Sequence, residues 1–169
     1  STLSSSSAAS DVYKRQDDAC DYIISKTEKD GISILKLQKL LYYCQAWYLA
    51  FGRGTLFDSK FQAWVHGPVN RHIYDRFKDS KYLYSSVTME DIKPDFSYDK
   101  LKAVEKAHID AVLSVYAIYT GDQLEAMAHD EEPWIAARGG IPLHESCESE
   151  IDEKIMESYY KARLKAKKA

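Results

Sequence analysis

The most constraining feature of the sequence is an apolar segment from Ile34 to Phe51. Ser33 suits the N-cap of a helix there, and Gly52 and Gly54 suit its C-terminal end. A helix with so much apolar surface must be buried, so we expect the rest of the chain to pack around it. Its large apolar residues recur at intervals of three and four and so share one broad helical face: Ile34, Leu37, Leu40, Leu41, Cys44, Trp47, Tyr48 and Phe51.

The remaining pattern predicts a mainly α fold, a compact single-domain helical bundle with one or two short strands near residues 56–66. Lys60 to His66 alternates apolar and polar residues like a strand, and Gly67-Pro68 is expected to end it. A helix is then expected from Pro68 to about Lys78. Other helices are expected after Asp17, from Tyr98 to Tyr119, around Leu124 and Met127, from Pro133 to Gly139 and from about Ser149 to Lys165, with a long loop at residues 79–97.

The first residues differ in composition from the rest of the chain. Residues 1–16 read STLSSSSAASDVYKRQ, and residues 6–16 resemble the translation of a sequencing-library adapter. We therefore expect residues 1–16 to be a non-native, adapter-derived or disordered leader. The native protein is expected to begin near Asp17, with the domain at residues 17–165 and a basic tail at residues 166–169.

Charge and cysteine content narrow the kind of partner. The chain has 23 Lys or Arg and 26 Asp or Glu, a net charge of −3, which lacks the basic excess typical of nucleic-acid binding. Cys20, Cys44 and Cys147 are odd in number and widely spaced, which favours free thiols in a reducing cytoplasm. Charged and amide residues interrupt the most apolar segment, so no membrane span is expected. A protein partner or a small ligand fits this composition better.

Two separated segments carry the residues best suited to a binding site. One interpretation is a pocket with two imidazoles that titrate near physiological pH, indole walls and a guanidinium that clamps an anion. The other is structural: tryptophans in the core, Gly-Pro at a corner and each histidine bonded to a backbone group. The residues concerned are Trp64, His66, Gly67 and Pro68 in the first segment and His129, Pro133, Trp134 and Arg138 in the second.

No metal, cofactor or nucleophilic catalysis is expected. The five histidines and three cysteines form no HExxH, CxxC or His-x3-His pattern, and no G-x-S-x-G or phosphate-binding glycine loop occurs. Asp130, Glu131 and Glu132 precede Pro133 and are expected to be a solvated helix start. Surface tyrosines, which suit a protein interface, are expected at Tyr42, Tyr43, Tyr82, Tyr84 and Tyr98.

Three blocks of the sequence together resemble the Panacea, or SocA-like, antitoxin family. They are KLQKLLYYCQAWYLA at residues 36–50, LFDSKFQAWVHGPVNRHIY at residues 56–74 and AHDEEPWIAARGG at residues 128–140. The resemblance implies a non-enzymatic antitoxin that binds and neutralises a cognate protein toxin of a bacterial or phage toxin–antitoxin system. It marks as family positions Lys39, Trp64, His66, Gly67, Pro68, Tyr74, His129, Pro133, Trp134 and Arg138.

Several alternatives remain at this point. The chain carries no added helix-turn-helix or zinc-ribbon module, so binding to DNA is not expected. We expect the toxin to meet the loop after Lys78 and the aromatic residues near Trp64 and Trp134. The competing hypotheses are an enzyme that binds a small molecule or nucleotide between His66 and His129, and an adaptor that delivers its partner to a protease. Whether the chain forms a homo-oligomer is open.

Overall fold

The computed structural model describes residues 2–27, 29 and 31–168, and the outermost residues of the expected leader and tail, Ser1 and Ala169, lie outside this range. Within it the fold is mainly α with one small antiparallel sheet, as predicted. Short 3-10 turns at Met89–Asp91 and Tyr98–Lys100 interrupt the long loop before α4. The elements are α1 (Thr2–Thr27), α2 (Ile34–Ala50), β1 (Phe61–Trp64), β2 (Gly67–Asn70), α3 (Arg71–Phe77), α4 (Ala103–Tyr116), α5 (Gly121–His129), α6 (Glu132–Arg138) and α7 (Glu153–Lys168).

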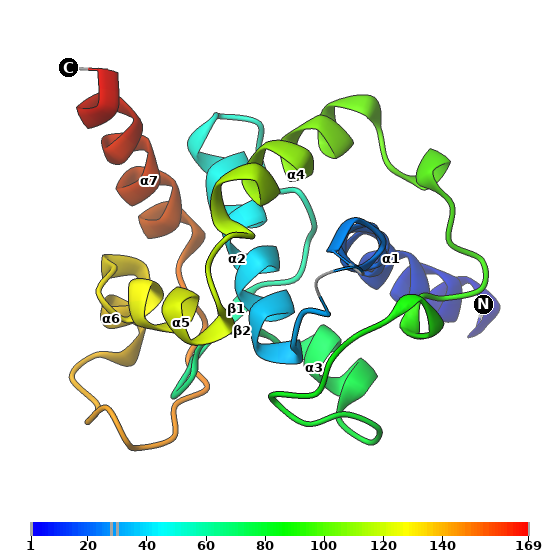
Figure 1. Ribbon diagram of the computed structural model, residues 1–169, viewed down its shortest axis with the longest axis horizontal. Coiled ribbons are helices and arrows are strands. Elements are labelled where there is room, and N and C mark those ends of the chain that lie inside the picture. Colours follow the sequence, from blue (N-terminus) through cyan, green and yellow to red (C-terminus); the bar gives the residue numbers. More distant parts are fainter. Residues whose placement is uncertain (1, 28, 30, 169) are drawn as a thin grey trace.

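Helix α2 is the centre of the molecule. Figure 1 shows it between α5, α6 and α7 on one side and α1 and α3 on the other, with α4 across its C-terminal half. The prediction of a single buried face was wrong, because 16 of its 17 residues are buried. Tyr42 and Tyr43, expected at the surface, are fully buried, whereas Phe51 at the C-terminal end is half exposed. A helix enclosed on all sides needs partners for its polar groups on all sides.

Two glutamines of α2 supply hydrogen bonds to neighbouring backbone. The Gln38 side chain donates to Asn70 O (3.1 Å) and accepts from Asn70 N–H (2.8 Å), so it pairs with β2 as a neighbouring strand would. Gln45 Oε1 accepts from Leu56 N–H (2.8 Å), and Gln45 Nε2 donates to Phe57 O (2.8 Å). These bonds fix the hairpin and the loop before it to the central helix.

The sheet is a hairpin in which Trp64 pairs with Gly67 and Phe61 with Asn70. The expectation that a helix starts at Pro68 was wrong: Gly67 adopts a φ of +94° that lets the chain reverse, and Pro68 lies in β2. Proline is acceptable there because β2 is an edge strand. Helix α3 begins three residues later, where the Asn70 side chain accepts from Ile73 N–H (3.1 Å).

Segments distant in the sequence complete this region. Ala63 N–H donates to Ser149 O (2.9 Å) and Ile151 N–H to Phe61 O (2.7 Å), so residues 149–151 cover the outer edge of β1. Because these residues are extended, α7 starts at Glu153 rather than near Ser149. Similarly, α4 starts at Ala103, after the second 3-10 turn, rather than at Tyr98.

The N-terminal segment is helical from residue 2 onward and continuous with the rest of α1. Arg15 forms an ion pair with Glu105 (3.0 Å), and the Tyr13 ring stacks on His72 with centroids 4.4 Å apart. That the native protein begins near Asp17 stays a prediction. No helix among the described residues combines the length and apolar character that crossing a membrane requires.

Candidate functional site

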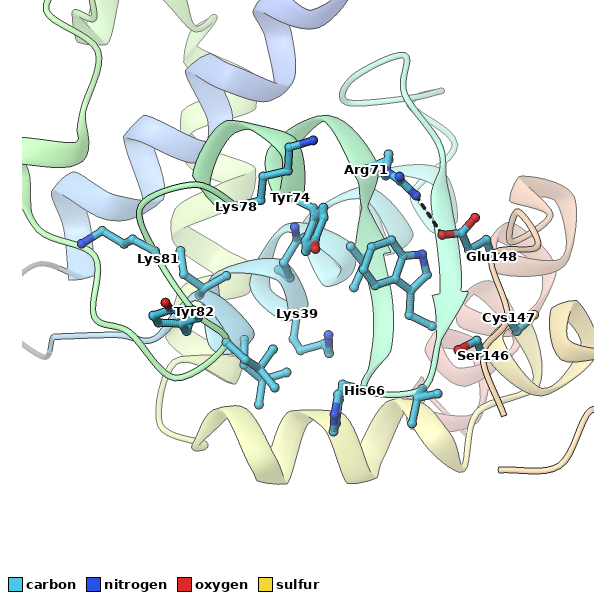
Figure 2. A pocket seen from close by; sticks show the side chains of 17 residues that line it. Lys39, His66, Arg71, Tyr74, Lys78, Lys81, Tyr82, Ser146, Cys147 and Glu148 are labelled. Atoms are coloured by element: carbon cyan, nitrogen blue, oxygen red, sulfur yellow. Dashed lines mark hydrogen bonds and ion pairs between the residues drawn. The ribbon is translucent and has the colours of Figure 1, made fainter. Parts of the chain in front are cut away.

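A surface cavity of about 640 Å³ opens beside the first turns of α2. Helix α2 forms its floor, the hairpin and α3 form one wall, and the loop around Leu83 and the segment at residues 146–148 close it (Figure 2). Ile34 N–H donates to Ser85 O (3.0 Å) and Leu35 N–H to Leu83 O (2.9 Å), so the loop is bound to the exposed backbone of the helix start. We call this feature the Lys39 cavity after the residue at its floor.

Lys39 is fully buried although it lines the cavity, because the hairpin covers its methylene stem. Its Nζ donates to Pro68 O (3.0 Å). Desolvation lowers the pKa of the ammonium to about 7, even though the nearby Glu125 carboxylate acts to raise it. Lys39 is therefore close to the balance between its charged and neutral forms at physiological pH.

Gly67 is the residue that allows this burial. A Cβ at this position would lie 2.7 Å from Lys39 Cε, well inside van der Waals contact, and the positive φ is itself unfavourable for other residues. The Gly67-Pro68 pair expected at a corner thus has two roles. Gly67 makes room for the lysine stem, and Pro68 supplies the carbonyl that the ammonium binds.

The aromatic wall of the Lys39 cavity comes from Trp64 and Tyr74. Their rings meet edge to face with centroids 4.7 Å apart, and the Arg71 guanidinium lies over Trp64. The indole N–H of Trp64 donates to Gln62 Oε1 (2.7 Å). His66 is exposed at the turn of the hairpin, where its Nδ1 lies 2.7 Å from Glu125 Oε1. Of the predicted site residues, the cavity therefore brings together Lys39, Trp64, His66 and Tyr74.

The second predicted segment lies on the other side of the hairpin. His129 Nε2 is 2.8 Å from Val65 O, Trp134 Nε1 donates to Trp64 O (2.9 Å) and Arg138 donates to Ala63 O (3.0 Å). Three side chains from α5 and α6 therefore bind three consecutive carbonyls, and we call them the turn clamp. Arg138 also donates to the carbonyls of Pro142 and Glu145, and Pro133 sits in the first turn of α6.

His66 and His129 lie in different environments, because only His129 belongs to the turn clamp. Desolvation lowers the pKa of His129, which favours a neutral ring that donates Nε2–H to Val65 O. The His129 ring stacks on Trp134 with centroids 4.2 Å apart and does not line the Lys39 cavity. The structure thus brings His66 to the cavity and gives His129, Trp134 and Arg138 bonds to the backbone that shapes it.

Sequence reasoning missed a buried polar cluster around Glu131. Its Oε1 accepts from the hydroxyls of Tyr43 (2.7 Å) and Tyr160 (2.8 Å), and its Oε2 lies 2.5 Å from Arg163 Nη1. The expectation of a solvated acidic helix start was wrong for Glu131, which is buried. Local sequence carried no signal, because the partners lie on α2 and α7, far from Glu131 along the chain.

A second charged cluster was also missed. Asp17 and Asp21 of α1 are buried, and Arg76 of α3 binds both, at 3.3 and 2.5 Å. Asp17 also lies 3.0 Å from His72 Nε2 and 2.7 Å from Lys93 Nζ. In the described part of the chain no group of three or more His, Cys, Asp or Glu could hold a metal ion, and all three cysteines are buried and unpaired.

Comparison with models of protein families shows that this region belongs to a known family. A family model described as "Antitoxin SocA-like, Panacea domain" matches residues 37–135. The matched range contains α2 from its fourth residue, the hairpin, α3, α4, α5 and the start of α6, and so most of the Lys39 cavity. Neither the search of curated proteins nor the search of solved structures found a match.

Proposed function

Because the chain belongs to the SocA-like antitoxin family with a Panacea domain, we propose that it binds a cognate protein toxin of a bacterial or phage toxin–antitoxin system and neutralises it by occlusion. The family match over residues 37–135 carries this proposal. In this function the protein is a binding protein that acts in the cytoplasm and catalyses no reaction.

We propose that the toxin-binding surface is the rim of the Lys39 cavity. The loop that closes the cavity presents Tyr82, which is 85% exposed, and Tyr84, which is 64% exposed. Tyrosine suits a recognition surface because it offers a large contact area at a small cost in side-chain entropy. The bonds from Ile34 and Leu35 hold this loop in place before binding, which reduces the entropy lost on association.

The histidine arrangement supports occlusion over catalysis. An acid–base reaction between His66 and His129 needs both imidazoles to reach one substrate, but the His129 ring is committed to Val65 O and stacked on Trp134. His66 pairs with Glu125 at the exposed turn. The polar side chains of the second predicted segment bind backbone carbonyls of the hairpin, which supports a structural role for them over a catalytic one.

The test is co-expression with the toxin encoded by the reading frame next to this gene. Wild type is expected to restore growth and to co-purify with the toxin. The double variant Tyr82→Ala, Tyr84→Ala is expected to bind at least tenfold more weakly. Tyr98→Ala is the matched control, because Tyr98 is an exposed tyrosine that contacts α1 instead. Failure of the wild type to bind the toxin would refute the function, and tight binding by the double variant would refute the surface.

Two further measurements separate the alternatives. His66→Ala is expected to fold and to rescue growth as well as wild type does, and loss of rescue with retained toxin binding would instead favour catalysis. The half-life of the toxin in cells is expected to be unchanged or longer in the presence of the antitoxin. A shortened half-life that depends on a cellular protease would favour the adaptor hypothesis.

A further inference from the structure

The charges that line the Lys39 cavity are matched except at its floor. Lys81 lies 3.3 Å from Asp91 and Lys78 lies 3.4 Å from Asp75. At the opposite wall Arg71 binds Glu148 at 3.0 Å, the contact drawn dashed in Figure 2. Each cation at the rim therefore already has a carboxylate partner within the protein.

Lys39 differs from these rim cations. Among the residues that the structure describes, no carboxylate lies within ion-pair distance of its Nζ, and Pro68 O is the one acceptor that the ammonium binds. A protonated lysine has three donors, so two N–H groups lack an acceptor. Lysine is almost never fully buried without a partner, because desolvating its charge is costly. Figure 2 shows the side chain in the middle of the cavity, between Tyr74 and His66.

We propose that Lys39 anchors a carboxylate side chain of the toxin, an aspartate or glutamate that enters the cavity and accepts the two spare N–H groups. This inference rests on the proposed function and names the chemistry of the contact. The walls around the lysine come from apolar residues such as Val69 and Leu83 and from the Trp64 ring. The entering acid is therefore flanked by apolar or aromatic residues of the partner, and its charge is neutralised in a site of low polarity.

Binding of a partner carboxylate at Lys39 is coupled to the uptake of a proton by the lysine. The free ammonium has a pKa of about 7, and a bound anion stabilises its charged form, so binding above neutral pH takes up a proton at Nζ. The groups that face Lys39 are Glu125 and His129 of α5 and, along the cavity, His66 and Arg71. Lys39 has a pKa of about 7, close to this range, so its proton is expected to govern the pH dependence of binding between pH 7.5 and 8.5.

The experiment selects ligands from a random heptapeptide library displayed on phage, using the full-length protein at pH 6.5 as bait. Wild type is expected to enrich peptides with an Asp or Glu beside an apolar or aromatic residue. Lys39→Met keeps the buried stem but lacks the charge, and it is expected to lose this enrichment. Lys154→Met removes an exposed lysine of α7 and serves as the matched control. No acidic enrichment by wild type, or the same enrichment by Lys39→Met, would overturn the proposal.

The most enriched peptide is then titrated by calorimetry in two buffers of different ionisation enthalpy. Between pH 7.5 and 8.5 its affinity is expected to fall up to about tenfold with proton uptake, because each unit above the pKa of a required proton lowers affinity tenfold. A pH-independent affinity without proton uptake would refute the anchoring role. Thermal unfolding of Lys39→Met shows whether that variant is folded, and acidic enrichment does not depend on whether the neighbouring toxin binds. The two proposals can thus fail separately.

Discussion

Replacing Gly67 by alanine tests how the hairpin and the buried lysine depend on each other. The new Cβ would lie 2.7 Å from Lys39 Cε, and the alanine would have to adopt a φ of +94°. The backbone strain costs about 1–3 kcal/mol, and displacing the Lys39 stem, whose Nζ is bound to Pro68 O, costs about another 1–3 kcal/mol. We therefore expect a loss of about 2–6 kcal/mol in the free energy of unfolding, a shift of roughly 5–20 °C for a chain of this size.

Urea unfolding followed by circular dichroism measures this loss, and two comparisons separate its parts. Gly139→Ala carries a positive φ of +57° with no neighbour within reach of a Cβ, so it should cost only about 1–2 kcal/mol. In a Lys39→Ala background the steric part disappears, so the added cost of Gly67→Ala should fall by about 1–3 kcal/mol. Equal costs for both glycines, or a cost that does not change when the lysine is shortened, would show that the close approach is not what requires Gly67.

Three other perturbations address groups outside the cavity. Glu131→Leu leaves the buried hydroxyl of Tyr43 without its acceptor, whereas the Tyr160 hydroxyl keeps the Tyr42 hydroxyl as an acceptor at 3.1 Å, so the change should cost about 1–3 kcal/mol in urea unfolding; no measurable cost would contradict the role given to this carboxylate. Gln16 is buried with no hydrogen-bond partner for its amide among the described residues, so Gln16→Leu should raise the unfolding free energy by about 1–3 kcal/mol; an unchanged or lower unfolding free energy would show that the amide is not an unsatisfied buried group. Burial acts to raise the pKa of Asp17, but hydrogen bonds from His72 and Lys93 outweigh it and hold the pKa at about 2. The stability it contributes should therefore be present above about pH 4 and lost as the pH falls toward 2, so the gap between wild type and Asp17→Asn should close over that range.

The helical plan of the chain could be predicted because it depends on local signals. Apolar spacing located α2, and the Ser33 cap predicted for it forms a hydrogen bond to Lys36 N–H (3.1 Å). The predicted helix start at Pro68 was wrong because a proline after a glycine fits both a helix start and an edge strand. The choice between them depended on the φ of Gly67 and on the bonds from Gln38, neither of which is visible in local sequence.

The candidate site was predicted as a set of residues but not as an arrangement. The structure brings Trp64, His66 and Lys39 to one cavity, but their division between a cavity wall and a buried floor depends on the hairpin and has no signal in the local sequence. Tyr43 illustrates the limit most clearly. The aromatic ring of Tyr43 is compatible with a buried helix, but its hydroxyl needs a hydrogen-bond acceptor. That acceptor, Glu131, is brought to it only by the tertiary structure.

Both edges of the hairpin are already hydrogen-bonded to other parts of the chain. One edge is taken by residues 149–151, and at the other the Gln38 side chain occupies both backbone groups of Asn70. An incoming strand of a partner finds no row of unpaired backbone groups at these edges, which agrees with the proposal that side chains on the rim carry recognition. Substitutions at Tyr82 or Tyr84 leave the backbone bonds of the scaffold intact. Under the proposed function, the exchange of one toxin for another would therefore require only substitutions in this loop and no new fold.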